Sequence, residues 1–427
     1  MRAGRGLIPL VVVLVPTLVS GGTGNQTRSL VDLGVLVLLL VLGVISWLVT
    51  RWQVSEGTLR IETGLLRRQS LRFPLTQIQA IDVVRPALAR VAGLSELRLR
   101  MAGSGAGAGR LAYLTRGEAE ELRGRLLALA HGIAEDTPPP PGRTLVSVPA
   151  GRLVTSIALS KLGLVAGGIV VVLFVIAAVL PAALPGIVGA SAAGLLGLAT
   201  ALWRRLNGNW RLSVAEAPDG FRLTSGLLET TTETIPRGRV QAVRMVEPLL
   251  WRPLGWCRLE VDVAGRQRKR GENQAESHAL RSVLPVGSVD DARWLLTRIL
   301  PGAPQAGSGS GRWWIAPRRA RWKSPLRYRN LSWIRTDTCA GATSGRLART
   351  TAWVPLDKVQ SLRRVQGPVQ RRLGLVTLHL DSAGRSVHAA LRDRDAKEGS
   401  AALEELTTLC RAERSRARDA ASAPRGA

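Results

Sequence analysis

The chain has 427 residues, of which 46% are hydrophobic but only 4% aromatic, and its formal net charge is +28. This length exceeds what one ordinary core uses, and the aliphatic bias indicates membrane segments together with small cores. Its three cysteines lie far apart and form no CxxC pair, which excludes a disulfide framework and a cysteine zinc site. The positive charge implies an acidic partner surface, either anionic lipid headgroups or nucleic acid.

The first fifty residues contain two apolar runs. Leu33–Thr50 is uncharged and long enough to span a bilayer with its flanks. Leu7–Val19 is shorter and fits two interpretations, a span paired with Leu33–Thr50 or the apolar region of a cleaved signal peptide. No good small-residue cleavage site follows it, and the next segment is plainly hydrophobic. The paired span is therefore favoured, which makes residues 1–50 a transmembrane hairpin.

A second apolar region lies in the middle of the chain. Leu162–Trp203 contains no charged residue and is about twice as long as one span. Pro181 and Pro185 interrupt it. The pattern predicts a helical hairpin with spans near residues 153–180 and 186–203.

The distribution of arginine predicts the topology. The turns "SGGTGNQTRS" and "PAALPG" carry one arginine between them, whereas the other loops and both ends are rich in arginine. Cytoplasmic loops near membrane spans collect Lys and Arg. The Arg-, Ala- and Gly-rich composition is typical of a bacterial source. Both hairpins are thus predicted to point outward across a bacterial inner membrane, with every large polar segment in the cytoplasm.

One stretch occurs three times: "FPLTQIQAI", "IPRGRVQAV" and "VPLDKVQSL". With the three prolines aligned, identical residues recur without a gap over about forty residues, which establishes an internal repeat. The recurring positions are Gly64, Gly226 and Gly345, then Gly93, Gly255 and Gly374, then Leu97, Leu259 and Leu378, and finally the pairs Ala102-Gly103, Ala264-Gly265 and Ala383-Gly384.

Each repeat reads as short strands followed by one helix. Apolar residues alternate with polar ones after the second repeat glycine, as in Leu97, Leu99 and Met101, and each copy ends in a helical stretch such as "RGEAEELRGRLLALAHG". The glycine that follows the short turn is a natural helix C-cap. The pattern predicts a small half-open barrel sealed by a C-terminal helix.

The first copy, "GLLRRQSLRFPLTQIQAIDVVRPALARVAGLSELRL", resembles the bacterial PH-like domain of the membrane-flanked YdbS/YdbT-like family. The resemblance extends over all three copies and the hairpins beside them. It implies a pleckstrin-homology-like barrel, membrane anchoring and no known enzyme activity. The third copy departs from the pattern, because no hairpin precedes it and "GRLAR" replaces "GLL".

The expected fold class is a multidomain membrane protein with two transmembrane helical hairpins and three PH-like β-barrel units, each closed by a C-terminal α-helix. The expected segments are hairpin 1 (1–50), unit 1 (51–135), a Pro-rich linker (136–150), hairpin 2 (151–205), unit 2 (206–302), a linker with a basic-aromatic segment (303–330), unit 3 (331–415) and a disordered tail (416–427).

Two recurring polar positions are candidate repeat-surface residues. They are Gln79, Gln241 and Gln360, and Arg90, Arg252 and Arg371. In the functional interpretation they form a repeated binding surface. In the structural interpretation, which is favoured, the glutamines bond backbone at a bulge and the arginines cap a carbonyl.

The segment "RWWIAPRRARWKSPLRYRN" has seven cations, no acids and four aromatics. The candidate membrane-surface residues in it are Arg312, Trp313, Trp314, Arg318, Arg319, Arg321, Trp322 and Lys323. Trp beside Arg and Lys is how a chain lies on an anionic leaflet. The same composition also fits nucleic-acid binding or a strand packed on the third unit. The membrane interpretation is favoured over nucleic acid because the chain is already tethered there.

No catalytic constellation is visible. The four histidines lack ligand spacing, and the glycine-rich Gly103–Arg110 lacks the Lys-Ser/Thr of a P-loop. The sequence therefore predicts no enzyme activity, no metal and no cofactor. It predicts an integral membrane scaffold whose cytoplasmic PH-like units bind protein partners or anionic lipid headgroups. The alternative is a transport or export component built from the four spans, which the absence of ionisable residues in Leu162–Trp203 disfavours.

Overall fold

The structure is a computed structural model of the chain. It describes residues 51–55, 58–63, 69–74, 78–86, 89–90, 93–101, 110–131, 143–180, 184–217, 220–264, 280–303, 313–384 and 386–422. The predicted hairpin 1 lies outside the described residues.

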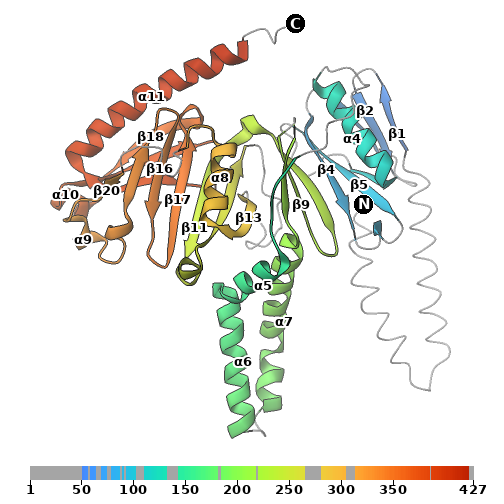
Figure 1. Cartoon of the computed structure of the whole chain (residues 1–427), viewed down its shortest axis with the longest axis horizontal. Helices are drawn as coiled ribbons and strands as arrows, with labels where there is room; N and C mark the ends of the chain where they lie inside the picture. Colours follow the sequence, from blue (N-terminus) through green and yellow to red (C-terminus); the bar gives the residue numbers. More distant parts are fainter. Residues whose placement is uncertain are drawn as a thin grey trace.

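Three similar units follow one another along the chain and lie in a row (Figure 1). Each has strands before the repeat proline, three strands after it, and a C-terminal helix. Unit 1 consists of β1 (Arg51–Ser55), β2 (Thr58–Thr63), β3 (Gln69–Pro74), β4 (Ile78–Arg85), β5 (Leu94–Met101), β6 (Arg110–Thr115) and α4 (Arg116–His131).

Units 2 and 3 each have four strands before the proline. Unit 2 consists of β7 (Arg143–Ser147), β8 (Ser213–Ala217), β9 (Gly220–Ser225), β10 (Thr230–Ile235), β11 (Val240–Pro248), β12 (Trp256–Val263), β13 (Leu280–Ser288) and α8 (Val289–Ile299). Unit 3 consists of β14 (Trp314–Ile315), β15 (Ser332–Arg335), β16 (Cys339–Ser344), β17 (Ala348–Pro355), β18 (Val359–Val365), β19 (Leu375–Ser382), β20 (Ala389–Asp395) and α11 (Ala396–Ser422). The helix α11 continues past the predicted unit boundary at residue 415.

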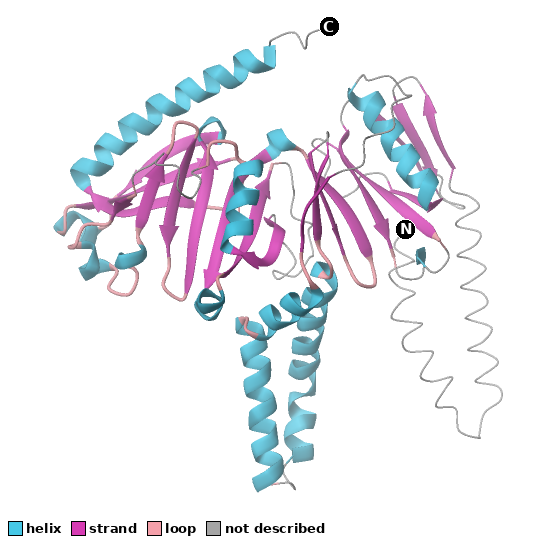
Figure 2. Cartoon of the chain, viewed as in Figure 1, coloured by secondary structure: helices cyan, strands magenta, loops and turns pink. Residues whose placement is uncertain are grey.

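Neighbouring units share their sheets (Figure 2). One seven-stranded sheet has the order β6-β5-β4-β10-β9-β8-β7 and therefore joins the second half of unit 1 to the first half of unit 2. The next, β13-β12-β11-β17-β16-β15-β14, joins units 2 and 3 in the same way. Two three-stranded sheets, β1-β2-β3 and β18-β19-β20, remain at the two ends. The prediction of PH-like β-units is confirmed. The units are not self-contained barrels sealed by a helix, because β4 and β11 hydrogen-bond to β10 and β17 of the following units.

The two junctions use the same register. At the first, Arg85 lies opposite Thr230, and at the second Glu247 lies opposite Arg349. In both pairs the first residue stands eleven positions after one repeat proline and its partner six before the next. Repetition of the sequence is thus accompanied by repetition of the contact between units.

Three helices connect β7 to β8, namely α5 (Ala150–Ala158), α6 (Lys161–Val179) and α7 (Leu184–Asn209). The helices α6 and α7 form a hairpin that projects from the row of sheets (Figure 1). The predicted first span near residues 153–180 is wrong at its start. Ser160 caps a new helix by accepting from the Gly163 N–H, and the separate α5 buries Leu153 in the unit 2 core.

Among the described residues, α6 is the one helix long and apolar enough to cross a membrane, judged by length and composition. It has no buried residue, and large side chains such as Phe174 are three-quarters exposed. The prediction of two transmembrane hairpins therefore remains a proposal.

Candidate binding surface

The recurring arginines act at the junctions between units. Arg90 Nη1 donates to the Leu227 carbonyl at 3.1 Å, and Arg252 Nη2 donates to the Arg346 carbonyl at 2.7 Å. Each acceptor follows the first repeat glycine of the next unit. Arg371, at the same position of the last unit, is exposed, and its guanidinium makes no interaction with any described residue. Two of the three arginines thus cap carbonyls across junctions, and the third meets no such carbonyl among the described residues.

The recurring glutamines do not share one environment. Gln241 is buried, and its Nε2 lies 3.5 Å from the Arg239 carbonyl. Gln360 is exposed on β18, whereas the side chain of Gln79 lies outside the described residues. A common binding role for the glutamines therefore stays a prediction.

The basic-aromatic segment takes the place of the helical hairpin in unit 3. It connects β14 to β15 as α5, α6 and α7 connect β7 to β8. An equivalent backbone hydrogen bond joins the two ends of each connection. The Val148 N–H donates to the Leu212 carbonyl at 2.8 Å in unit 2, and the Ala316 N–H donates to the Leu331 carbonyl at 2.9 Å in unit 3. The segment contains the short helices α9 (Ala320–Lys323) and η5 (Tyr328–Asn330). It is not a free linker but part of the third unit.

Part of this segment is anchored in unit 3. Lys323 Nζ lies 2.6 Å from Asp393 Oδ1, and Ser324 Oγ donates to Asp393 Oδ2 at 3.0 Å. Gln370 Nε2 donates to the same buried carboxylate at 2.7 Å. Trp314 stacks on Trp333 with 4.5 Å between ring centroids. These contacts fix the segment on the protein through residues that the sequence assigned to a membrane surface.

The rest of the segment faces solvent. Trp322 is 71% exposed, and the Arg321 guanidinium lies over its ring at 5.4 Å. Arg318 is exposed, and Arg319 pairs with Asp395 while its Nη2 donates to the Gly374 carbonyl. Trp313 is partly exposed, with its ring edge-on to Trp353. Arg312 lies outside the described residues.

Exposed apolar side chains occur in turns and short helices of units 2 and 3, and one of them, Leu228, contacts the base of the hairpin. The Leu228 N–H donates to Asn207 Oδ1 at the end of α7, and the Leu249 N–H donates to the Leu347 carbonyl. We call this set the hairpin-side residues. They are Leu228, Leu249, Leu250, Leu254, Trp322, Leu326, Leu347 and Val369, all at least 43% exposed. Leu228 and Leu347 share one repeat position, eight residues before the proline, and Leu250 and Val369 share another, fourteen residues after it.

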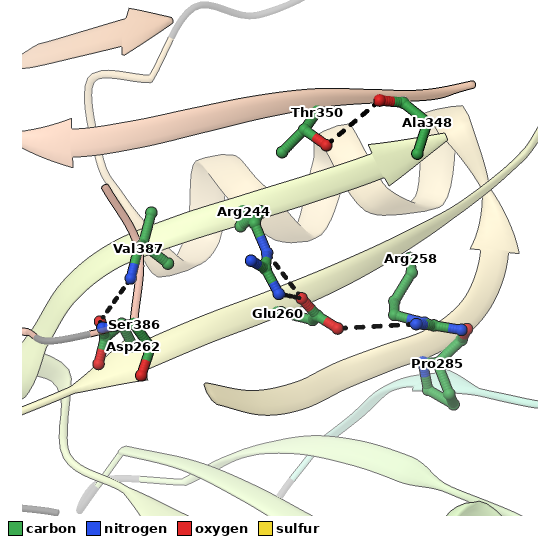
Figure 3. A network of polar contacts seen from close by, with 9 residues as sticks. All are labelled: Arg244, Arg258, Glu260, Asp262, Pro285, Ala348, Thr350, Ser386 and Val387. Atoms are coloured by element: carbon green, nitrogen blue, oxygen red, sulfur yellow. Dashed lines mark hydrogen bonds and ion pairs between the residues drawn. The ribbon is translucent and has the colours of Figure 1, made fainter. Parts of the chain in front are cut away.

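A charged network lies on β11 and β12 of unit 2 (Figure 3). Arg244 donates twice to Glu260 Oε2, at 2.8 and 2.5 Å, and Arg258 Nη1 lies 3.8 Å from Glu260 Oε1. Burial, followed by the nearby Arg205 cation, lowers the pKa of Arg258 to about 10. Arg258 therefore remains charged at neutral pH, and the network is a structural ion cluster.

A polar contact between units 2 and 3 involves Asp262 (Figure 3). Its Oδ2 accepts from the Ser386 and Val387 N–H groups at 2.9 and 3.1 Å. Asp262 is buried, and Gly384 lies so close that a Cβ there would meet its carboxylate at 2.5 Å. The repeat glycine at this position thus has a packing reason that the sequence alone did not reveal.

Within the described residues, no group of three or more His, Cys, Asp or Glu side chains is placed to hold a metal ion. The three cysteines are buried. Burial raises the pKa of Cys257 to about 12 and of Cys339 to about 11, which makes these thiols poor nucleophiles.

No curated protein sequence matches this chain. The bacterial PH domain family, in contrast, matches three times, at residues 7–130, 158–303 and 313–408. These matches cover more than half of the chain and coincide with the three structural units and the apolar segments beside the first two. The chain therefore belongs to the bacterial PH domain family and carries three copies of its domain.

Proposed function

We propose that this protein is a membrane-anchored, non-enzymatic scaffold that holds three PH-like domains at the cytoplasmic face of a bacterial inner membrane. The single observation that carries the proposal is α6, a 19-residue apolar helix with no buried residue. Val170, Val171 and Phe174 are 65%, 61% and 75% exposed. Such a surface is costly in water and favourable in a bilayer.

The charge on the two sides of α6 supports this orientation. Arg152 precedes α6 and Lys161 is its first residue, while Arg204 and Arg205 lie in the last two turns of the returning helix α7, so cations flank the base of the hairpin. Cationic flanks are typical of the cytoplasmic side. The PH-like units, which lie at this base, would then be cytoplasmic.

The hairpin-side residues indicate how the units meet the lipid. Leu228 contacts Asn207 at the end of α7. Trp322 of unit 3 occupies the repeat position of Trp203 in unit 2, since each stands thirty-three residues before its repeat proline. Trp beside Arg318 and Arg321 suits the boundary of an anionic leaflet. We propose that unit 3 rests on the headgroups through this segment and that the remaining surface of the units binds protein partners.

Carbonate extraction of membranes that contain the full chain tests the anchoring. The full chain is expected to remain in the membrane pellet. Val171→Lys, which places a charge in the middle of α6, is expected to move much of the protein to the soluble or aggregated fraction. The matched control Val171→Leu keeps an apolar side chain and is expected to remain in the pellet. Extraction of the unaltered chain by carbonate would overturn the proposal.

The lipid contact has its own test. A Trp322→Cys variant labelled with an environment-sensitive dye, in nanodiscs of zwitterionic or of anionic lipid, is expected to report a less polar surrounding only with anionic lipid. The difference should shrink as salt is raised. A signal indifferent to lipid charge would remove headgroup binding and leave protein partners as the role of the units.

A further inference from the structure

The last unit ends in a sheet edge that is paired in the other two units. The strand β18 occupies the repeat position of β4 and β11, which pair with β10 and β17 of the following units. No described strand pairs with the outer side of β18. Gln360, Ser361, Arg363, Arg364 and Val365 are exposed, whereas Ile81–Val84 of β4 and Val240–Val243 of β11 are buried. The outer edge of β18 therefore has the position of a junction strand, but it lacks the described partner strand that β4 and β11 have.

The arginine that caps a carbonyl at each junction also lacks a described acceptor beside β18. Arg90 and Arg252 each donate to a carbonyl just ahead of the incoming strand, at 3.1 and 2.7 Å. Arg371 holds the same position beside β18 and makes no side-chain interaction with a described residue. Strand edge and arginine together make a ready template for an added strand.

The charge of the edge selects the occupant. Arg363 and Arg364 lie on β18, and Arg371 and Arg372 follow on α10 (Pro368–Arg372). Asp381, 3.7 Å from Arg363, is the acid paired with this cluster among the described residues. In unit 1, β3 pairs with β2 on one side and with no described strand on the other. It belongs to "LLRRQSLRFP", which is itself basic. That segment would bring three more arginines, Arg67, Arg68 and Arg72, close to the arginines of this edge. Juxtaposition of like charges disfavours an association, so a second copy of this chain is a poor occupant.

We infer that β18 is a docking edge for an extended acidic segment of a protein partner, which adds to the sheet as β10 adds to β4. The register follows from the two internal junctions. At the second junction Arg244 lies opposite Ala352 and Met245 lies opposite Thr351, three and four residues before the repeat proline. Arg363 and Arg364 occupy the repeat positions of Arg244 and Met245. They should therefore face the residues three and four positions before the equivalent proline position of the added strand. Carboxylates at these positions would pair with the arginines. This inference does not depend on the membrane proposal.

The chain supplies its own matched probes. The peptide "LLETTTETIP", the sequence of residues 227–236, carries two acids and no base, and it places Glu233 opposite Arg363. The peptide "LLRRQSLRFP", residues 65–74, has the same length and repeat position but carries three arginines. Binding of both peptides to the full chain in detergent, measured by fluorescence anisotropy, is the test. The acidic peptide is expected to bind and to weaken with salt, and the basic peptide is expected not to bind.

Variants locate the site. Arg363→Glu with Arg364→Glu is expected to weaken binding of the acidic peptide by roughly tenfold, while Arg411→Glu with Arg418→Glu on α11 makes the same charge change and should leave it intact. Arg371→Ala should weaken the ten-residue peptide severalfold but leave a peptide of residues 230–236 unchanged, because the shorter peptide lacks the carbonyl that the arginine would cap.

The outcomes separate the alternatives. The inference is supported if the acidic peptide binds and if the β18 and Arg371 variants weaken its binding as stated. Equal or tighter binding of the basic peptide would overturn it in favour of a second copy of the chain. Absence of binding by either peptide, or binding indifferent to the β18 variants, would overturn the docking edge itself.

Discussion

The recurring arginines share one repeat position but differ in their contacts, and this difference can be tested. Arg252 donates to a carbonyl of the next unit, whereas Arg371 has no such acceptor among the described residues. Arg252→Ala should lower the free energy of unfolding by about 1 kcal/mol, the value of a partly exposed charge-assisted hydrogen bond. Arg371→Ala should leave it unchanged. Thermal unfolding in detergent measures both, and an equal loss in the two variants would contradict the junction role.

The carboxylate of Asp393 carries a second prediction at this scale. It is buried and holds Lys323, Ser324 and Gln370. Lys323→Met removes the cation from a buried carboxylate and is expected to destabilise unit 3 by about 2 kcal/mol. Lys358→Met breaks a local pair with the adjacent Asp357 and should cost about 0.5 kcal/mol or less. Equal melting temperatures of the two variants would show that Asp393 does not need Lys323.

The thiols give a pH-dependent prediction. Burial raises the pKa of Cys257 to about 12 and of Cys339 to about 11, and it also raises the pKa of Cys410. A raised pKa leaves little thiolate at pH 8, and the thiolate is the reactive form. The folded chain at pH 8 is therefore expected to resist thiol reagents, and the denatured chain is expected to react at all three cysteines. Rapid modification of the folded chain would contradict the burial.

At the scale of elements, two repeat glycines have different reasons to be glycine. Gly255 ends η4 (Leu249–Leu254) with φ +63° and has open space around it, whereas Gly345 has φ +96° and a Cβ there would collide with the Ala348 carbonyl. Gly255→Ala should cost about 1 kcal/mol, the penalty of left-handed backbone alone. Gly345→Ala should cost about 3 kcal/mol because backbone must also move. Unfolding midpoints that fall in the reverse order would contradict the turn geometry.

Much of the element structure follows from the sequence. The Gly255 C-cap, the alternation in β12 and the C-terminal helix of each unit were predicted from spacing alone, because they depend on local backbone preference and on one buried face. The separate helix α5 was missed, since hydrophobicity runs across Ser160 without interruption and only the cap hydrogen bond marks the break. The sequence contained a signal for the exposed leucines, because a Leu stands two residues after the first repeat glycine of every copy, at Leu66, Leu228 and Leu347.

At the scale of the whole molecule, the shared sheets could not be derived from the sequence. The repeat shows that the units are alike, and a closed barrel and an open one that pairs with its neighbour have the same alternation pattern. The choice depends on contacts such as Val84 with Thr231, which join residues far apart in the chain. The consequence is a row of units whose relative positions are held by backbone hydrogen bonds between neighbouring strands.

Labelling from outside the cell tests the central claim, that α6 carries the chain across the membrane while the PH-like units stay inside. Leu180→Cys lies at the end of α6, and Leu228→Cys lies at its base among the hairpin-side residues. With a membrane-impermeant maleimide on intact spheroplasts, the account predicts labelling at residue 180 and labelling at residue 228 only after lysis. Labelling of residue 228 in intact spheroplasts, or protection of both residues until lysis, would contradict it.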